Sequence, residues 1–253
     1  MTTKELDRYF KKFLDIDGFL SSDSSMNGLQ VDNDGARILK VAFAVDACLE
    51  TIERAIAGGA GLLFVHHGLF WGKPLALTGG HRRRIARSLE SNLAIYGVHL
   101  PLDQHPEVGN NAGLAELLGI SDPVPFGEYH GKKIGYKGKL SKPLSVEEAA
   151  AKISFEGRPP VAVFPFGPRL SETCAVISGG AAYEAIQAID EGVDLYVTGE
   201  ASHSIYHQAL EGRLNFIAGG HYSTEVWGVR RVMSRLAAES GLETEFIDAP
   251  TGL

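Results

Sequence analysis

Hydrophobic and polar positions alternate along this chain with two periodicities, one typical of helices and one typical of strands. Apolar residues recur at helical spacing between Leu6 and Leu14, directly after a Thr2–Glu5 capping box. A polar loop follows at 21–30, and then apolar runs alternate with amphipathic stretches. The pattern predicts strands around 39–45, 62–66 and 94–98, and helices near 49–57, 82–91 and 111–118. Such alternation favours a largely parallel sheet with helices on its faces.

Residues 121–172 interrupt the alternation of predicted strands and helices. Prolines punctuate the segment, which leaves short β-like pieces at 133–139 and 161–166 and one helix near 146–152. We expect an irregular connecting subdomain here.

The alternation then resumes as a weak copy of the first half. Strands are predicted at 174–178, 195–198 and 214–218, and helices at 182–190, 202–210 and 224–239. Residues 61–67 overlay 194–200, and with a slightly different offset His99 overlays His221 and Asp103 overlays Glu225. We therefore expect an α/β fold of two similar lobes with mainly parallel sheets, residues 1–122 and 123–253. The last helix could also pack on the first lobe. A ligand site between the lobes, at the carboxyl ends of strands, follows from this organisation.

Composition limits the classes of function. A net charge of -7 disfavours nucleic acid as a partner, because phosphate backbones are held by basic patches. Two cysteines, Cys48 and Cys174, imply no disulfide framework. The start of the chain lacks a signal-peptide pattern, and no apolar run is long enough to span a bilayer. We expect a cytoplasmic protein without membrane contact.

Candidate chemistry gathers where predicted strands end. The run at 62–65 ends in His66-His67, and two other segments place a carboxylate four residues after a histidine: His99 with Asp103, and His221 with Glu225. Four imidazoles and two carboxylates suit a metal site of mixed nitrogen and oxygen ligands. They exceed what one zinc needs, so two ions ~3.5–4 Å apart with a bridging carboxylate and water fit better. Zinc, iron, manganese, nickel and cobalt all suit these ligands.

Local geometry adds further expectations. Consecutive strand residues point to opposite faces, so His66 and His67 share one region only if the strand ends there, or if each faces its own ion. Pro101 should keep 99–103 from forming a regular helix, and Glu225 should stand in the first turn of the last helix. A single strand-end histidine is more often a core or surface residue, and Glu225 alone could be a helix N-terminal acid.

Weaker signals leave alternatives open. Arg82, Arg83 and Arg84 could grip a substrate phosphate at a helix start, or form a solvated face or subunit contact. Glu200 could act as a general base, or orient a histidine such as His203. Asp46 and Cys48 follow a strand and could approach the metal-site cavity, although a capping or packing role is favoured.

Five short motifs together resemble the NIF-three/YbgI-like family, whose members are often labelled GTP cyclohydrolase I type two homologues. The matching stretches are Asn27-Gly28-Leu29-Gln30, His66-His67-Gly68-Leu69-Phe70-Trp71, His99-Leu100-Pro101-Leu102-Asp103, Val197-Thr198-Gly199-Glu200 and His221-Tyr222-Ser223-Thr224-Glu225. The resemblance runs nearly end to end, and the chain resembles the compact form without a long central insertion.

The resemblance implies a dinuclear metal site with ligands His66, His67, Asp103, His221 and Glu225, the glutamate bridging. His99 would lie beside the site as an outer-shell group or proton carrier. It also implies a homohexameric ring with the metals facing a central cavity.

Two hypotheses of function follow. The first is a dinuclear metal-dependent hydrolase, GTP cyclohydrolase-like, in which a metal-bridged hydroxide attacks a small anionic or purine-like substrate while His99 or Glu200 moves protons. The rival is a ring-shaped metal-binding regulatory or interaction protein without catalysis.

Overall fold

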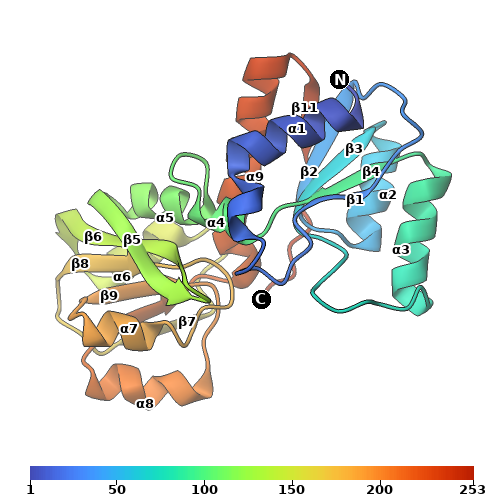
Figure 1. Cartoon of the computed structure of the whole chain (residues 1–253). Coiled ribbons are helices and arrows are strands. Elements are labelled where there is room, and N and C mark those ends of the chain that lie inside the picture. Colours follow the sequence, from blue (N-terminus) through green and yellow to red (C-terminus); the bar gives the residue numbers. More distant parts are fainter. The chain divides into compact units, whose positions relative to one another are not determined.

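The computed structural model describes all residues from Met1 to Leu253 and divides the chain into two compact units (Figure 1). The first unit comprises Met1–Leu102 and Val229–Ala249, and the second comprises Asp103–Gly228 and Pro250–Leu253. The units are therefore interleaved in sequence, because the chain returns to the first unit within its last long helix.

The first unit is built on a five-stranded sheet with the strand order β1-β4-β3-β2-β11. Its strands are β1 Gly28–Val31, β2 Lys40–Asp46, β3 Leu62–His67, β4 Ala94–Gly97 and β11 Glu243–Phe246. The strands from β4 to β11 run parallel, and only β1 is antiparallel to its neighbour β4. The central strands β2 and β3 are buried almost throughout, as expected for parallel strands covered on both faces.

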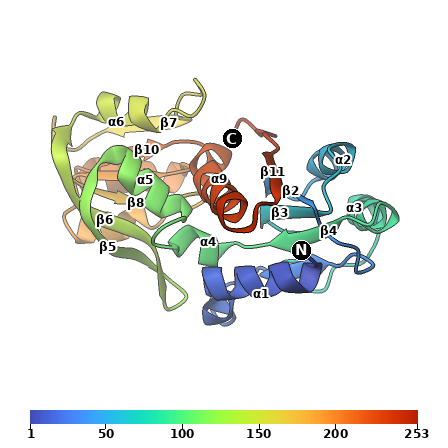
Figure 2. The ribbon, with the colours of Figure 1, turned by 90° about the horizontal axis from the view of Figure 1, so that it is seen from above.

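Helices cover both faces of this sheet (Figure 2). They are α1 Thr3–Leu14, the short 3-10 helix η1 Ile16–Phe19, α2 Leu49–Ala57 and α3 Gly79–Glu90. On one face the Phe10 ring of α1 lies 4.9 Å from Phe64 and 5.0 Å from Tyr96, between ring centroids. On the other face Ile52 of α2 belongs to a cluster with Leu63. Successive residues of β3 thus serve opposite faces.

The second unit holds a six-stranded sheet with the order β5-β6-β8-β9-β10-β7. Its strands are β5 Ile120–Tyr129, β6 Lys132–Leu144, β7 Ala162–Pro165, β8 Ser171–Val176, β9 Leu195–Thr198 and β10 Asn215–Ala218. The pairs β8–β9 and β9–β10 are parallel, and the other three pairs are antiparallel.

Helices also cover both faces of the second sheet. They are α5 Asn110–Leu118, α6 Val146–Ile153, α7 Ala185–Asp190 and α8 His203–Glu211. Leu114 of α5 and Ala149 of α6 share a buried cluster with Val197 of β9. In Figure 1, α7 and α8 lie on the face of this sheet opposite α5. Two further helices, α4 Leu100–Gln104 and α9 His221–Ser240, contain residues of both units.

The segment 121–172 is more regular than its sequence predicts. It contains most of the antiparallel hairpin of β5 and β6 as well as α6 and β7. Pro123 and Pro125 fit within β5 because this strand lies at the edge of the sheet, where a missing backbone N–H need not break a ladder. The prediction of mainly parallel sheets therefore holds for the first unit, while the second sheet is mixed.

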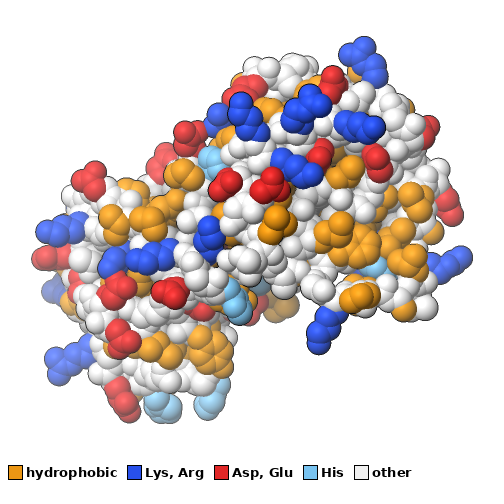
Figure 3. All heavy atoms as spheres, in the orientation of Figure 1, with side chains coloured by type: hydrophobic (Ala, Val, Ile, Leu, Met, Phe, Trp, Pro, Cys, Tyr) orange, Lys and Arg blue, Asp and Glu red, His pale blue; other side chains and the backbone are white.

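On the face shown in Figure 3, acidic and basic side chains are interspersed. Basic side chains gather over α1, yet the groove there is lined by Asp7, Asp15 and Asp17 as well as by Lys4 and Arg8. Every helix is too short or too polar to be a bilayer-spanning segment.

Candidate metal centre

Three histidines meet at the carboxyl end of the first sheet. His66 and His67 are the last residues of β3, and His99 follows β4, its parallel neighbour. Each ring offers one nitrogen, and these three nitrogens lie within 4.8 Å of one another. The strand ends at His67, so the two adjacent rings share one region, with centroids 4.7 Å apart. We call His66, His67 and His99 the histidine triad.

Each ring of the triad has an oxygen acceptor at Nδ1. His66 Nδ1 lies 2.9 Å from the Val98 carbonyl oxygen, and His67 Nδ1 lies 2.8 Å from an Asp46 carboxylate oxygen. His99 Nδ1 lies 3.0 Å from Asp23 Oδ1. A carbonyl or carboxylate oxygen can only accept, so the proton belongs on Nδ1 and Nε2 carries the lone pair. This is how outer-shell groups commonly prepare histidines for a metal ion.

Asp23 is the centre of a buried hydrogen-bond network. Its side chain is 1% exposed and also accepts hydrogen bonds from the Ser25 and Leu100 backbone N–H groups and from the Asn27 side chain. Burial alone would raise the pKa of Asp23, but His99 and the other donors outweigh it and hold the pKa below its ordinary value. Asp23 therefore stays charged and fixes the His99 ring.

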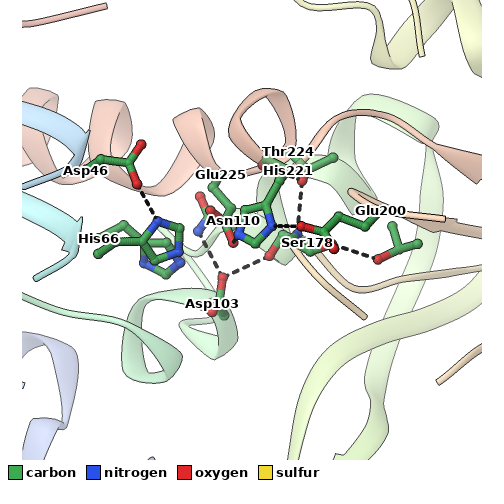
Figure 4. Close-up of polar contacts among 12 residues, drawn as sticks. Asp46, His66, Asp103, Asn110, Ser178, Glu200, His221, Thr224 and Glu225 are labelled. Atoms are coloured by element: carbon green, nitrogen blue, oxygen red, sulfur yellow. Dashed lines mark hydrogen bonds and ion pairs between the residues drawn. The ribbon is translucent and has the colours of Figure 1, made fainter. Parts of the chain in front are cut away.

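A second donor set lies in the second unit, after β9 and β10. His221 begins α9, and its Nε2 lies 3.2 Å from Glu225 Oε1, one helical turn later. Its Nδ1 donates to Glu200 Oε1 at 2.6 Å, so Glu200 does for His221 what Asp46 does for His67 (Figure 4). Glu225 is 3% exposed.

Asp103, on α4, is the second buried carboxylate of this unit. It is 5% exposed, and its Oδ1 accepts hydrogen bonds from the Asn110 side chain at 2.9 Å and the Ser178 hydroxyl at 2.8 Å (Figure 4). Buried carboxylates are costly unless a cation or several donors compensate their charge.

One glycine makes room for Glu225. Gly179 has a φ of 67°, and a Cβ added there would stand 2.2 Å from Glu225 Oε1. Any side chain at this position would displace the carboxylate, so the Ser178-Gly179-Gly180 turn shapes the second donor set.

The structure corrects two local expectations. Residues 100–104 form a short helix, because a proline in the first helical turn loses no intrahelical hydrogen bond. The last helix begins at His221, not at residue 224, so Glu225 lies beyond its first turn. The i,i+4 spacing within a helix, rather than a capping position, brings Glu225 to His221.

Other singled-out residues lie elsewhere or act differently. Glu200 orients a histidine, as one alternative held, but that histidine is His221 and not His203. His203 and His207 are exposed on α8, and Arg82 and Arg83 are exposed on α3. Asp23 was not predicted from the sequence, and for Asp46 a capping or packing role was favoured over an approach to the site. The position of Asp46 at the end of β2, which pairs with β3, is the feature that could have indicated its contact with His67.

The donor atoms fit a divalent metal that prefers nitrogen and oxygen. Imidazoles with fixed tautomers and buried carboxylates supply them, and no thiolate takes part. Cys48 caps α2, and Cys174 is buried in β8, where burial raises the pKa of its thiol. These histidine and carboxylate groups could therefore bind a divalent metal ion.

Comparison with known proteins identifies the family of this chain. The family model described as Duf34/NIF3 (NGG1p interacting factor 3) matches residues 1–251. The chain belongs to this family. The NIF3-family chain is 43% identical over 253 residues to a protein of Archaeoglobus fulgidus named GTP cyclohydrolase 1 type 2 homolog, covering 100% of both chains. A protein of Treponema pallidum with the same name is 41% identical, again over 100% of both chains.

Solved structures of relatives share the fold. The protein ybgI, titled as of unknown function, superimposes with a TM-score of 0.92 at 35% identity over 100% of both chains. Reduced HcgD from Methanocaldococcus jannaschii gives a TM-score of 0.85 at 28% identity over 98% of both chains. The expected membership of a YbgI-like family is thus confirmed.

Proposed function

We propose that this NIF3-family protein is a hydrolase that depends on two divalent metal ions, with His66, His67, Asp103, His221 and Glu225 as their ligands. One observation carries the proposal: the Nδ1 of each ligand histidine is bonded to an oxygen acceptor, as in metal sites with an organised outer shell. Asp103 and Glu225 are buried carboxylates, which supports the same assignment.

Two ions in such a site would supply Lewis acidity toward water and toward the electrophilic atom of a substrate. The residues of this chain would prepare that chemistry. Asp46 and Glu200 hold the rings of His67 and His221, and Asn110 and Ser178 hold Asp103. Glu225 would supply its carboxylate to the metal ions as the bridging ligand that the family resemblance implies.

Proton transfer falls to Glu200 in this proposal. Its side chain is 52% exposed and hydrogen-bonded to His221, so it can exchange protons with solvent while remaining oriented. His99, the other residue predicted to be catalytic, belongs by its position to the histidine triad.

The names of the relatives suggest a purine nucleotide as substrate class. A cyclohydrolase adds water to a ring carbon and breaks one carbon–nitrogen bond, and the departing nitrogen takes up a proton. Arg82 and Arg83, exposed at the start of α3, are candidates for contact with the phosphates of such a substrate.

A second candidate function is supported by the family description, which names an interacting factor. A homohexameric ring whose metals regulate binding rather than catalysis would fit that description. The ring itself is a prediction from the family resemblance, and sedimentation of the purified protein would test it.

Turnover distinguishes the two candidates. Metal-free protein is reloaded separately with zinc, manganese, iron, cobalt or nickel and incubated with GTP, other nucleotides, phosphoesters and amides. The same screen is run on His67→Ala/Glu225→Ala and on His203→Ala, which removes an exposed histidine of α8 as a matched control.

We expect activity in the wild type and in His203→Ala, and its loss in the double variant. Activity that survives in the double variant would place the chemistry elsewhere. A wild type that is inactive with every metal and substrate would favour the interaction protein.

A further inference from the structure

Trp71 is an exposed aromatic residue in the loop that follows β3. It is 37% exposed, whereas the large tryptophan ring is usually buried to a greater degree because it contributes strongly to a hydrophobic core. Its ring centroid lies 5.9 Å from that of His67 and 4.9 Å from that of His99. An apolar surface is thus open to solvent beside two residues of the histidine triad.

Hydrogen bonds fix the position of Trp71. Its indole Nε1 donates to the Gly68 carbonyl oxygen at 3.1 Å. A β-bridge joins its backbone to Ser25, and the Met26 N–H donates to the Phe70 carbonyl oxygen at 3.0 Å. The only polar atom of the ring is therefore satisfied within the protein, so a need for hydration does not explain why the ring is exposed.

Further apolar side chains are exposed in the same two loops. Met26 is 52% exposed, Leu75 is 49% exposed and Leu77 is 57% exposed. Single exposed apolar residues are common on proteins, but several of them on two loops that are hydrogen-bonded to each other indicate a binding surface. Sites for small molecules combine apolar and aromatic surface of this kind with a few polar groups.

The ring of Trp71 suits a planar ligand better than an organic cation. Organic cations are recognised by cages of aromatic side chains, whereas the rings beside Trp71 are the imidazoles of His67 and His99. A divalent ion bound by these histidines would also repel a second cation. A planar nitrogen heterocycle, in contrast, can stack on an indole at a centroid distance of ~4.5–7 Å.

We infer that Trp71 is a stacking platform, on which a small-molecule ligand places its planar nitrogen heterocycle beside the histidine triad. This role deepens the proposed function, on which it rests, because it gives the ring of the substrate a binding residue. The binding that it requires can be measured without turnover.

Fluorescence of the full chain carrying Trp227→Phe reports on Trp71 alone, because the chain has only two tryptophans. Trp227 packs against Phe155 in the second unit, and its indole nitrogen has no hydrogen-bond partner, so phenylalanine is a conservative replacement. The protein is loaded with Zn²⁺ and titrated with guanosine, adenosine and pterin as ring probes. Ribose 5-phosphate is the probe without a ring. A heterocycle that stacks on the indole quenches its fluorescence.

Two replacements of Trp71 separate its aromatic face from its hydrogen bond. Trp71→Phe and Trp71→Leu both delete the N–H that donates to Gly68, but only phenylalanine keeps a face for stacking. Calorimetry with the ring probe that quenches most strongly measures the affinity of both variants and of the wild type. Trp227→Phe is the matched control, and circular dichroism checks that each variant is folded.

We expect at least one ring probe to quench Trp71 fluorescence and ribose 5-phosphate to leave it unchanged. Trp71→Leu should weaken the binding of that ring probe by on the order of 10–100-fold, as the loss of a base–aromatic stack does. The loss should be smaller in Trp71→Phe and absent in Trp227→Phe.

A lack of quenching by every ring probe would overturn the stacking role and leave the exposed apolar side chains to another partner. Equal affinities of Trp71→Leu and Trp71→Phe would overturn it as well. If Trp71→Leu fails to fold, the comparison of ring probes with ribose 5-phosphate decides.

Turnover separates this role from the proposed function. Metal-dependent activity that is as high in Trp71→Leu as in the wild type at low substrate concentration would contradict the stacking role and leave the hydrolase intact. Quenching by a ring probe in a protein that is inactive with every metal would support the stacking role and count against the hydrolase.

Discussion

At the scale of single residues, a hydrogen bond between a carboxylate and a histidine ring recurs in the candidate metal centre. Asp46 holds His67, Asp23 holds His99 and Glu200 holds His221, each through Nδ1. One interaction is thus used three times, in both units. It sets the tautomer of each ring and raises the basicity of Nε2, the nitrogen that would bind a metal ion.

Replacing Asp46 tests this device without touching a ligand. Asp46→Asn keeps an acceptor near His67 Nδ1 but removes the negative charge, so we expect metal affinity to fall by ~10-fold or more. Competition with a chromophoric chelator measures the change. Glu50→Gln, in the exposed pair with Arg54 nearby, should leave the affinity unchanged. Equal affinities for Asp46→Asn and wild type would show that Asp46 does not tune the site.

The candidate metal ligands could be picked out from the sequence, whereas most of the residues that hold them in place could not. His66-His67, His99 and His221 stand out because they follow apolar strands. Asp23 lies in a polar loop, and only the folded chain brings it to His99, 76 positions away. Serine, asparagine and aspartate are common in any loop, so this stretch carried no signal that separated a buried carboxylate from a solvated one.

Tyr9 gives the first unit a measurable response to alkaline pH. Burial raises the pKa of Tyr9 to about 12, together with the hydrogen bond that Tyr9 donates to Glu239 and the negative charge of Glu239. In the unfolded chain the phenol ionises near pH ~10, so the stability that neutral Tyr9 contributes is present below ~10 and lost as pH rises toward 12. We expect the melting temperature of the wild type to fall relative to Tyr9→Phe between pH 9 and 11.5, measured by circular dichroism. A difference that stays constant with pH would contradict this linkage.

At the scale of elements, the hydrophobic pattern of the sequence predicted the helices and the parallel strands, but it did not predict the irregular parts. α2 at Leu49–Ala57 and β9 at Leu195–Thr198 match their predicted ranges. The hairpin β5–β6 was obscured by prolines, which an edge strand tolerates. β1 and β11 are short strands at the two edges of their sheet, where half-exposed residues leave little hydrophobic pattern.

Capping boxes can be tested by comparing two helix starts. Ser145 caps α6 and accepts the Glu148 N–H, whereas Thr78 precedes α3 without a side-chain cap bond. We expect Ser145→Ala to lower the free energy of unfolding by ~1 kcal/mol and Thr78→Ala to change it much less. Urea unfolding of both variants measures the difference. Equal losses would mean that the cap bond contributes nothing.

At the scale of the whole molecule, bound metal should appear as stability. An ion that binds only the folded chain stabilises it by ~2.7 kcal/mol at a concentration 100 times its dissociation constant. We expect removal of metal with a chelator to lower the melting temperature and its return to restore it. His67→Ala/Glu225→Ala should show a smaller response. A melting temperature indifferent to metal in the wild type would argue against either donor set binding metal tightly.

The place of β11 beside β2 affects how the polypeptide matures as it is synthesised. The first sheet combines segments that precede and follow the stretch Asp103–Gly228, which forms most of the second unit and is made without interruption. On the ribosome the edge of β2 therefore stays uncovered until β11 has been made, whereas the second unit can already pack. The first unit would therefore be completed after the second, and its unpaired sheet edge is what nascent-chain chaperones would have to protect.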